Sequence, residues 1–439
     1  MTRRRLALAL VCLAALALAG CAAPSVEKAR PDPANDTVGW EGGYWHDDRL
    51  DVDGSDGLGS GERRAVVRQA MARVEYVRGL EFTEGVSVEV ISREQYRERN
   101  VFAGRGPPTY EAWRDQVWEG AFLVGEDRTA AAAFNRTYGA SVVGYYSPGR
   151  GDIVLVSDAA APTVDESVLA HELVHALQDQ RGWLGRNAGT HDGRLARTGL
   201  VEGDATAVQR AYMERCGEEW RCLDAPSRQG GAADYDRGLF LAVYAPYAEG
   251  PGFVEALRER GNWSTVNAAY ADPPVSTEQV IHPERYPADT PESVSVPDRS
   301  SAAWSRFDIA RTGERLGEAT IYAMLWANGV VDREGAAVYN YSHSASTGWA
   351  GDRLVPYRDG DRFGYVWQSE WDTAADAREF AAAYREVLAA HDARERGEGV
   401  YVVPESDPFG DAFRVSRSGT TVTVVNAPDT AALAGVHDG

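Results

Sequence analysis

The segment 163–182 constrains the fold of this chain more than any other part of the sequence. Thr163 and Glu166 have the spacing of a capping box, in which each side chain bonds the backbone amide of the other residue. Acidic residues at this point also suit the positive end of a helix dipole. Gly182 is a typical residue to end a helix. The sequence therefore predicts a single helix over 164–181.

Two histidines lie four residues apart in the middle of this predicted helix. His171 and His175 would stand one turn apart on one face, so both imidazoles can bind one ion. Zn²⁺ suits such a pair, because it binds neutral imidazole nitrogen at ~2.0–2.1 Å. Glu172 lies beside them, close enough to take a proton from a water on the ion. A catalytic zinc also needs a third protein ligand and an open fourth position.

The third ligand has two candidates. Glu202 lies on a second predicted helix, over 195–215, which we expect to run antiparallel to the first. Gly203 and Ala205 would let the two backbones approach. Asp204 should point away from Glu202. His191, expected in the loop between the helices, is the alternative, and Glu202 is the favoured ligand.

The charge of the chain excludes one class of partner. Its 439 residues include 66 acidic and 45 basic side chains, for a net charge of −21. Nucleic acid is therefore not expected as a partner, because binding it requires basic groups that neutralise phosphates. Lys28 is the only lysine, so the other basic residues are arginine. This combination indicates a protein adapted to high salt, which screens the repulsion between its carboxylates.

The N-terminus predicts export. Three arginines at 3–5 precede a short apolar core over 6–19, and Leu18-Ala19-Gly20-Cys21 is a lipobox. The arginines also fit a twin-arginine export signal. We therefore expect a lipoprotein on the extracellular face of the cell membrane, held there only by lipid on Cys21. Cys216 and Cys222 would then form a disulfide, because the compartment is oxidising.

The rest of the chain alternates between helical and strand patterns, which predicts an α+β fold. After the signal peptide (1–21) we expect a tether (22–38), an N-terminal α/β segment (39–107), the domain with the two histidines (108–286) and a C-terminal α/β segment (287–439). The further expected helices are 62–79, 110–122, 317–326 and 373–391. The expected strands are 86–91, 141–146, 153–156, 362–370, 399–403 and 420–426.

These motifs resemble a known class of zinc enzymes. The stretch His171-Glu-Leu-Val-His-Ala-Leu-Gln-Asp-Gln180, with Leu200-Val-Glu-Gly-Asp-Ala-Thr206, is similar to the gluzincins, zinc metallopeptidases whose third ligand is a glutamate on a following helix. The whole chain further resembles a family of haloarchaeal cell-surface lipoproteins. That second resemblance also covers Ser276-Thr-Glu-Gln-Val-Ile-His-Pro283 and Trp371-Asp-Thr-Ala-Ala-Asp-Ala-Arg-Glu-Phe380.

The resemblance implies a zincin-like core and a peptidase acting on peptide or protein substrates. Zn²⁺ would activate a water, and Glu172 would be the general base. His282 is the candidate donor to the oxyanion, or else a structural residue that caps the loop before Pro283. Many gluzincins carry Glu-x-x-x-Asp on the third-ligand helix, but Thr206 stands where that Asp would be. Asp179 could orient His175 instead, or could be a solvated helix residue. The alternative function is an inactive cell-surface binding or structural module that retains the peptidase fold.

Overall fold

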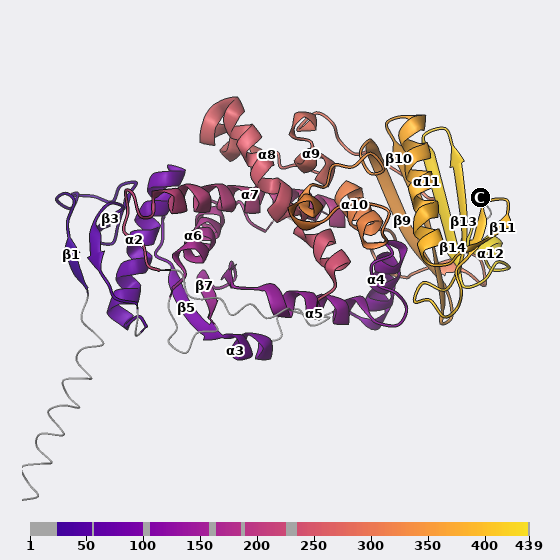
Figure 1. Cartoon of the computed structure of the whole chain (residues 1–439), viewed down its shortest axis with the longest axis horizontal. Coiled ribbons are helices and arrows are strands. Elements are labelled where there is room, and N and C mark those ends of the chain that lie inside the picture. The colour runs from indigo at the N-terminus through magenta and orange to yellow at the C-terminus, as the bar shows by residue number, and fades with distance from the viewer. Residues whose placement is uncertain are drawn as a thin grey trace, which may run out of the picture. The chain divides into compact units, whose positions relative to one another are not determined.

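The computed structural model describes residues 24–54, 57–99, 106–157, 164–185, 189–224 and 235–437 (Figure 1). Helices and strands alternate along the chain, which confirms the predicted α+β class. The signal peptide with Cys21 and the expected cap Thr163 lie outside the described residues. Within the described part, no helix is long and apolar enough to cross a membrane.

The chain divides into two compact units, each assembled from separate stretches of sequence. The first unit comprises 1–100, 142–186 and 204–232, and the second comprises 101–141, 187–203 and 233–439. These divisions cut across the consecutive segments expected from the sequence. One boundary falls inside a single continuous helix, α7 (His191–Arg215).

The first unit is built around two helices and a small sheet. Helix α2 (Ser60–Arg78) packs against α6 (Glu166–Gln180), and α6 packs against β6 (Gly144–Ser147) and β7 (Asp152–Ser157). The three-stranded sheet has the order β5-β7-β6, with β5 parallel and β6 antiparallel to β7. The elements of this unit besides α7 are β1 (Ser25–Glu27), β2 (Trp40–Glu41), β3 (Tyr44–Trp45), β4 (Arg49–Asp51), α2 (Ser60–Arg78), β5 (Ser87–Ser92), α3 (Arg93–Glu98), β6 (Gly144–Ser147), β7 (Asp152–Ser157) and α6 (Glu166–Gln180).

The described part of the expected tether, residues 24–38, packs against the rest of the first unit and is not a free linker. Strand β1 pairs antiparallel with β4, so that Val26 stands opposite Leu50. Ala29 donates its backbone N–H to Asp48 at 2.7 Å. Trp45 donates its indole N–H to the carbonyl of Pro31 at 3.0 Å. The proline-rich, acidic composition of this segment suggested a linker. Its pairing with β4 and its bond to Trp45 instead hold it against the rest of the unit.

The second unit combines helices with a larger sheet. All neighbouring strands of its seven-stranded sheet, in the order β11-β12-β13-β14-β10-β9-β8, are antiparallel. Its elements besides α7 are α4 (Pro108–Gly120), α5 (Ala130–Ser141), α8 (Arg237–Ala269), α9 (Thr277–Ile281), η1 (Pro283–Arg285), β8 (Ser305–Arg306), α10 (Gly317–Ala327), η2 (Gly335–Tyr339), β9 (Trp349–Asp359), β10 (Arg362–Trp371), α11 (Ala374–Ala390), β11 (Arg394–Gly397), β12 (Val400–Val402), β13 (Ala412–Ser418), β14 (Thr421–Ala427) and α12 (Leu433–Val436).

Aromatic side chains from this sheet and its helices form the core of the second unit. Helix α11 packs against β10, β13 and β14, and lies beside these strands in Figure 1. Trp367 of β10 meets Phe380 of α11 edge to face, with ring centroids 5.4 Å apart. Phe122 follows α4 and stacks on Phe409 at 4.8 Å. Thr373, the first residue of the predicted helix 373–391, caps α11 in a capping box with Asp376.

Candidate metal centre

Helix α6 carries both histidines and begins two residues later than predicted. It spans Glu166–Gln180, and its N-cap is Asp165, which accepts the backbone N–H groups of Ser167 at 3.0 Å and Val168 at 3.3 Å. Asp165 is therefore the cap in place of the expected Thr163, and the predicted capping box with Glu166 is wrong. The carboxylate of Glu166 bonds other residues instead. Gly182 ends the helix in the left-handed conformation, with φ +68°, as expected.

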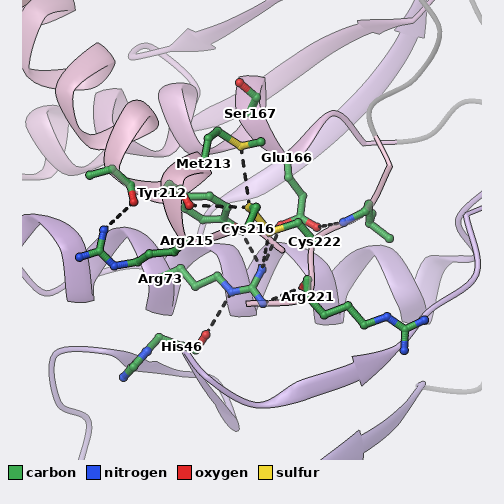
Figure 2. The surroundings of a disulfide bond; sticks show 12 residues. His46, Arg73, Glu166, Ser167, Tyr212, Met213, Arg215, Cys216, Arg221 and Cys222 are labelled. Carbon is green, nitrogen blue, oxygen red and sulfur yellow. Dashed lines mark hydrogen bonds and ion pairs between the residues drawn. A yellow bond between two sulfur atoms is a disulfide. The ribbon is translucent and has the colours of Figure 1, made fainter. Parts of the chain in front are cut away.

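The carboxylate of Glu166 anchors the start of α6 in a buried network (Figure 2). Its Oε2 accepts the hydroxyl of Tyr212 at 2.6 Å and the guanidinium of Arg73 at 3.1 Å. Its Oε1 accepts the backbone N–H of Leu223 at 2.7 Å. The predicted disulfide between Cys216 and Cys222 is present next to this network. The helix that carries the histidines is thus tied to α2 and to the disulfide loop.

The two imidazoles of α6 turn their Nε2 atoms toward one another. The Nε2 atoms of His171 and His175 lie 3.2 Å apart. Two nitrogens that bind one tetrahedral zinc at ~2.0–2.1 Å would be about 3.3 Å apart. The ring of His175 is buried, while His171 is partly exposed. The pair therefore has a spacing that fits one ion.

A chain of buried polar groups orients His175. Its Nδ1 lies 2.8 Å from Oε1 of Gln178, which leaves Nε2 free of the proton when Nδ1 donates. Gln178 donates Nε2 to Asp204 at 3.4 Å. Asp204 in turn pairs with Arg78 through two bonds, at 2.7 and 3.2 Å. Asp179, the residue suggested by the sequence, instead accepts the hydroxyl of Tyr146 at 2.8 Å.

Glu172, the expected general base, is buried against the edge strand β6. Only 6% of it is exposed. A Cβ atom on Gly144 of β6 would stand 3.5 Å from Oε1 of Glu172 and 2.7 Å from Cγ1 of Val168. The absence of a side chain at Gly144 therefore gives the Glu172 carboxylate its room beside the strand.

Glu202, the favoured third ligand, lies on α7 and is buried. His171, His175 and Glu202 each offer one ligand atom, and these atoms all lie within 4.8 Å of one another. Glu202 also accepts a hydrogen bond from the hydroxyl of Tyr247, in α8, at 3.2 Å. Two imidazole nitrogens and a carboxylate oxygen are ligands that Zn²⁺ accepts, so the donor set fits this ion.

The glycine beside Glu202 has a different partner from the one expected. A Cβ on Gly203 would stand 2.2 Å from the carbonyl oxygen of Gly250 in α8. A Cβ on Gly250 would likewise stand 2.3 Å from the carbonyl oxygen of Gly199 in α7. The glycines of α7 therefore allow the backbone of α8 to pack closely against that of α7. This close crossing brings Tyr247 to Glu202, which the sequence alone did not reveal because the two residues are far apart along the chain.

The alternative ligand His191 has a structural environment. It begins α7 instead of lying in a loop, and its ring packs edge to face on Trp118 with centroids 5.0 Å apart. Burial lowers the pKa of His191 to about 3, and the positive charge of Arg194 adds to the effect. His191 is not part of the trio that contains His171.

His282, the expected oxyanion donor, directs its Nε2 to a buried carboxylate. The distance to Oε1 of Glu318 in α10 is 3.1 Å. Burial opposes the charged form of the ring, but the hydrogen bond and charge of Glu318 outweigh it and raise the pKa of His282. The second nitrogen, Nδ1, lies 4.0 Å from Glu284. These contacts explain the position of His282 without a role in catalysis.

Comparison with known proteins identifies one family. Residues 305–437 match a family described as a domain of unknown function (DUF8575). The match covers less than half of the chain and contains the large sheet with α11, but none of His171, His175 and Glu202. No curated protein matches the chain. No solved structure matches it either. The likeness to gluzincins therefore rests on the motifs themselves.

Proposed function

We propose that this chain is an exported, lipid-anchored zinc peptidase of the gluzincin type, with a zincin-like core. The observation that carries the proposal is the convergence of His171, His175 and Glu202 on ligand atoms within 4.8 Å of one another, with Glu172 on the same helix. A glutamate beside the two histidines has no use in a purely structural site. Its presence favours an active enzyme over an inactive surface module.

The residues of the chain have distinct parts in this reaction. Zinc, when bound, supplies a Lewis acid that polarises the scissile carbonyl and lowers the pKa of water to ~7. Glu172 accepts a proton from the attacking water at a carboxylate oxygen and then passes it to the departing amine nitrogen. Gln178 holds the proton of His175 on Nδ1, so that Nε2 stays available as a ligand.

Tyr247 is the stronger candidate to donate a hydrogen bond to the carbonyl oxygen. Its hydroxyl donates to the Glu202 carboxylate at 3.2 Å and would have to turn from it, but 43% of the residue is exposed, so a substrate can reach it. His282 remains the second candidate. Its Nε2 would have to leave Glu318, 3.1 Å away, to serve as this donor.

The substrate class follows from the strand beside Glu172. Strand β6 is at the end of the order β5-β7-β6, so its outer edge has no strand partner among the described residues. An extended peptide can add to such an edge through backbone hydrogen bonds. The disulfide Cys216–Cys222 supports location in an oxidising compartment outside the cell. Peptide or protein outside the cell is therefore the proposed substrate.

The test measures zinc and cleavage together, on protein that begins at Ala22 and is kept in high salt. The wild type should hold one zinc and cleave members of a mixed peptide pool. Glu202→Ala should lose the zinc, whereas Glu214→Ala, an exposed glutamate of the same helix, should keep it. Glu172→Gln should keep the zinc and lose cleavage by about 10²–10⁴-fold.

Two results would change the conclusion. A wild-type protein without zinc would rule out the site at His171, His175 and Glu202. One zinc with no cleavage of any peptide in the pool would favour the surface module instead.

A further inference from the structure

A second group of carboxylates gathers in the second unit, on elements that do not carry His171, His175 or Glu202. Glu119 lies in the last turn of α4, Glu126 lies in the loop that follows, and Asp411 directly precedes β13. Each offers a carboxylate oxygen, and these oxygens all lie within 4.8 Å of one another. Glu119 and Asp411 are buried, with 5% and 6% exposed, while Glu126 is exposed.

Among the described charged residues that act most strongly on these carboxylates, none is positive. Within the described part of the chain, the charged groups that act most strongly on Glu119 are Asp411, Glu126 and Asp115. Those acting most strongly on Asp411 are Glu126 and Asp429. Glu119 also stands at the negative end of the α4 dipole, where a cation is favoured. Buried like charges of this kind are costly unless the carboxyls take up protons or a cation is paired with them.

Two buried amides point to the ligand. Gln116 donates its Nε2 to Oε2 of Glu119, and Asn426 donates its Nδ2 to Oδ2 of Asp411 at 2.8 Å. The carbonyl oxygens of these amides, Oε1 of Gln116 and Oδ1 of Asn426, are buried and have no hydrogen-bond partner in the described structure. Gln116 is only 4% exposed and Asn426 is fully buried. Each unpartnered oxygen belongs to an amide already turned onto a carboxylate of the cluster.

We propose that Glu119, Glu126 and Asp411, with the amide oxygens of Gln116 and Asn426, form a binding site for Ca²⁺. The five residues supply oxygen ligands only, and rotation of either amide presents its carbonyl oxygen in place of its nitrogen. Ca²⁺ takes six to eight such ligands at ~2.3–2.6 Å, including carboxylates, amide carbonyls and water. Ligands on opposite sides of one Ca²⁺ are about 5 Å apart, which accommodates the spacing of the cluster.

The surroundings of the cluster give the ion an entry path and a function. Glu126 is exposed, so an ion can enter from solvent on its side. The backbone N–H of Glu126 donates to the carbonyl of Pro408 at 2.8 Å, which joins the loop after α4 to the loop before β13. Bound Ca²⁺ would therefore clamp α4 to the C-terminal sheet and stabilise the second unit.

The experiment titrates CaCl₂ into the mature protein, supplied with zinc and freed of calcium, by calorimetry in high NaCl. We expect one saturable Ca²⁺ per chain, with Kd on the order of 10⁻⁴–10⁻³ M, as in extracellular modules. The melting temperature should rise by about 4 °C or more at a hundredfold excess over Kd. Mg²⁺ at the same concentration should have a smaller effect, because it gives up its water shell reluctantly.

Matched variants separate this site from general binding to an acidic surface. Glu126→Gln removes the negative charge of an exposed ligand without disturbing the core and should raise Kd by at least about tenfold. Asp411→Asn should do the same, and Asp127→Asn, which removes one charge from the same loop, should leave Kd unchanged. Glu202→Ala should also leave the calcium response intact, whatever its effect on zinc. Absence of saturable Ca²⁺ binding, or an equal loss in Asp127→Asn and Glu126→Gln, would overturn the proposal.

Discussion

At the scale of single residues, a chain of buried polar groups holds the ring of His175 in place. His175 depends on Gln178, and Gln178 depends on Asp204 and Arg78, all of them buried. Such partners fix the orientation and tautomer of a metal-binding imidazole. The glutamine takes the position in this chain that a carboxylate occupies in many zinc sites.

The first prediction concerns Gln178. Gln178→Ala should weaken zinc binding by about 10–100-fold, because the His175 ring loses the group that orients it. Zinc affinity, measured by competition with a chelating dye, checks this. Gln180→Ala is the control, since Gln180 lies on the same helix but bonds Thr83 and Glu84. Equal affinities of the two variants would show that Gln178 does not act on the metal site.

The second prediction concerns acid stability. Because the folded pKa of His191 is about 3, below its unfolded value of ~6.5, its neutral form stabilises the protein above ~6.5. This contribution should be lost as the pH falls from ~6.5 toward 3, at about 1.4 kcal/mol per pH unit. His191→Phe keeps an aromatic ring against Trp118 and should flatten this part of the pH profile. Denaturant unfolding between pH 7 and pH 4 measures it, and identical slopes would contradict it.

At the scale of elements, helix α6 is held between a strand and a buried ion pair. Its middle packs on β6, where Gly144 makes room for Glu172 and Val168. Its start is fixed by Glu166 to Arg73 and Tyr212. The helix therefore has its position set at two points, independently of any metal.

The third prediction tests the strand contact. Gly144→Ala would place a Cβ 2.7 Å from Val168 Cγ1, so the strand and helix must separate, at a cost of about 1–3 kcal/mol. Cleavage should fall more than zinc content, because Glu172 moves while the metal ligands stay. Gly149→Ala in the adjacent turn meets no atom within 4 Å and is the control. Unchanged cleavage in Gly144→Ala would refute this account of Glu172.

The fourth prediction tests the anchor at the start of the helix. Arg73→Met leaves the buried carboxylate of Glu166 without its ion-pair partner, and should lower the free energy of unfolding by about 3–5 kcal/mol. Urea unfolding measures the change. Arg64→Met, at an exposed position of the same helix α2, should cost little. A loss no larger than that of the control would mean that the pair adds nothing to stability.

At the scale of the whole molecule, we expect the charge of −21 to make the stability of the chain depend on salt. Many acidic side chains repel one another in the folded state, and this repulsion falls as salt shortens the screening length to ~3 Å at 1 M. Buried ion pairs such as Arg78–Asp204 are shielded from salt and should persist.

The fifth prediction follows from this contrast. The melting temperature should rise steadily between 0.1 and 2 M NaCl, as the surface repulsion is screened. Calorimetry across this range, at constant pH and with zinc and calcium fixed, provides the measurement. A melting temperature independent of NaCl would show that the acidic surface does not limit stability.

The sequence by itself determined the local features of this protein. Periodicity and end signals predicted α2, the β6–β7 hairpin, α10 and α11 close to their observed bounds, because these patterns act over a few residues. The spacing of His171 and His175 determined that they share a helix face. The pairing of Cys216 with Cys222 followed from the export signal, which predicts an oxidising compartment, and from their separation of six residues.

Only the tertiary structure decided how distant segments meet. It drew β1 onto β4, placed Tyr247 of α8 beside Glu202, and gave His175 the partner Gln178 in place of Asp179. It also brought Asp411, from a remote part of the chain, beside Glu119 and Glu126. These contacts depend on which surfaces pack together when the core forms, and packing is set by all the elements at once rather than by a local pattern.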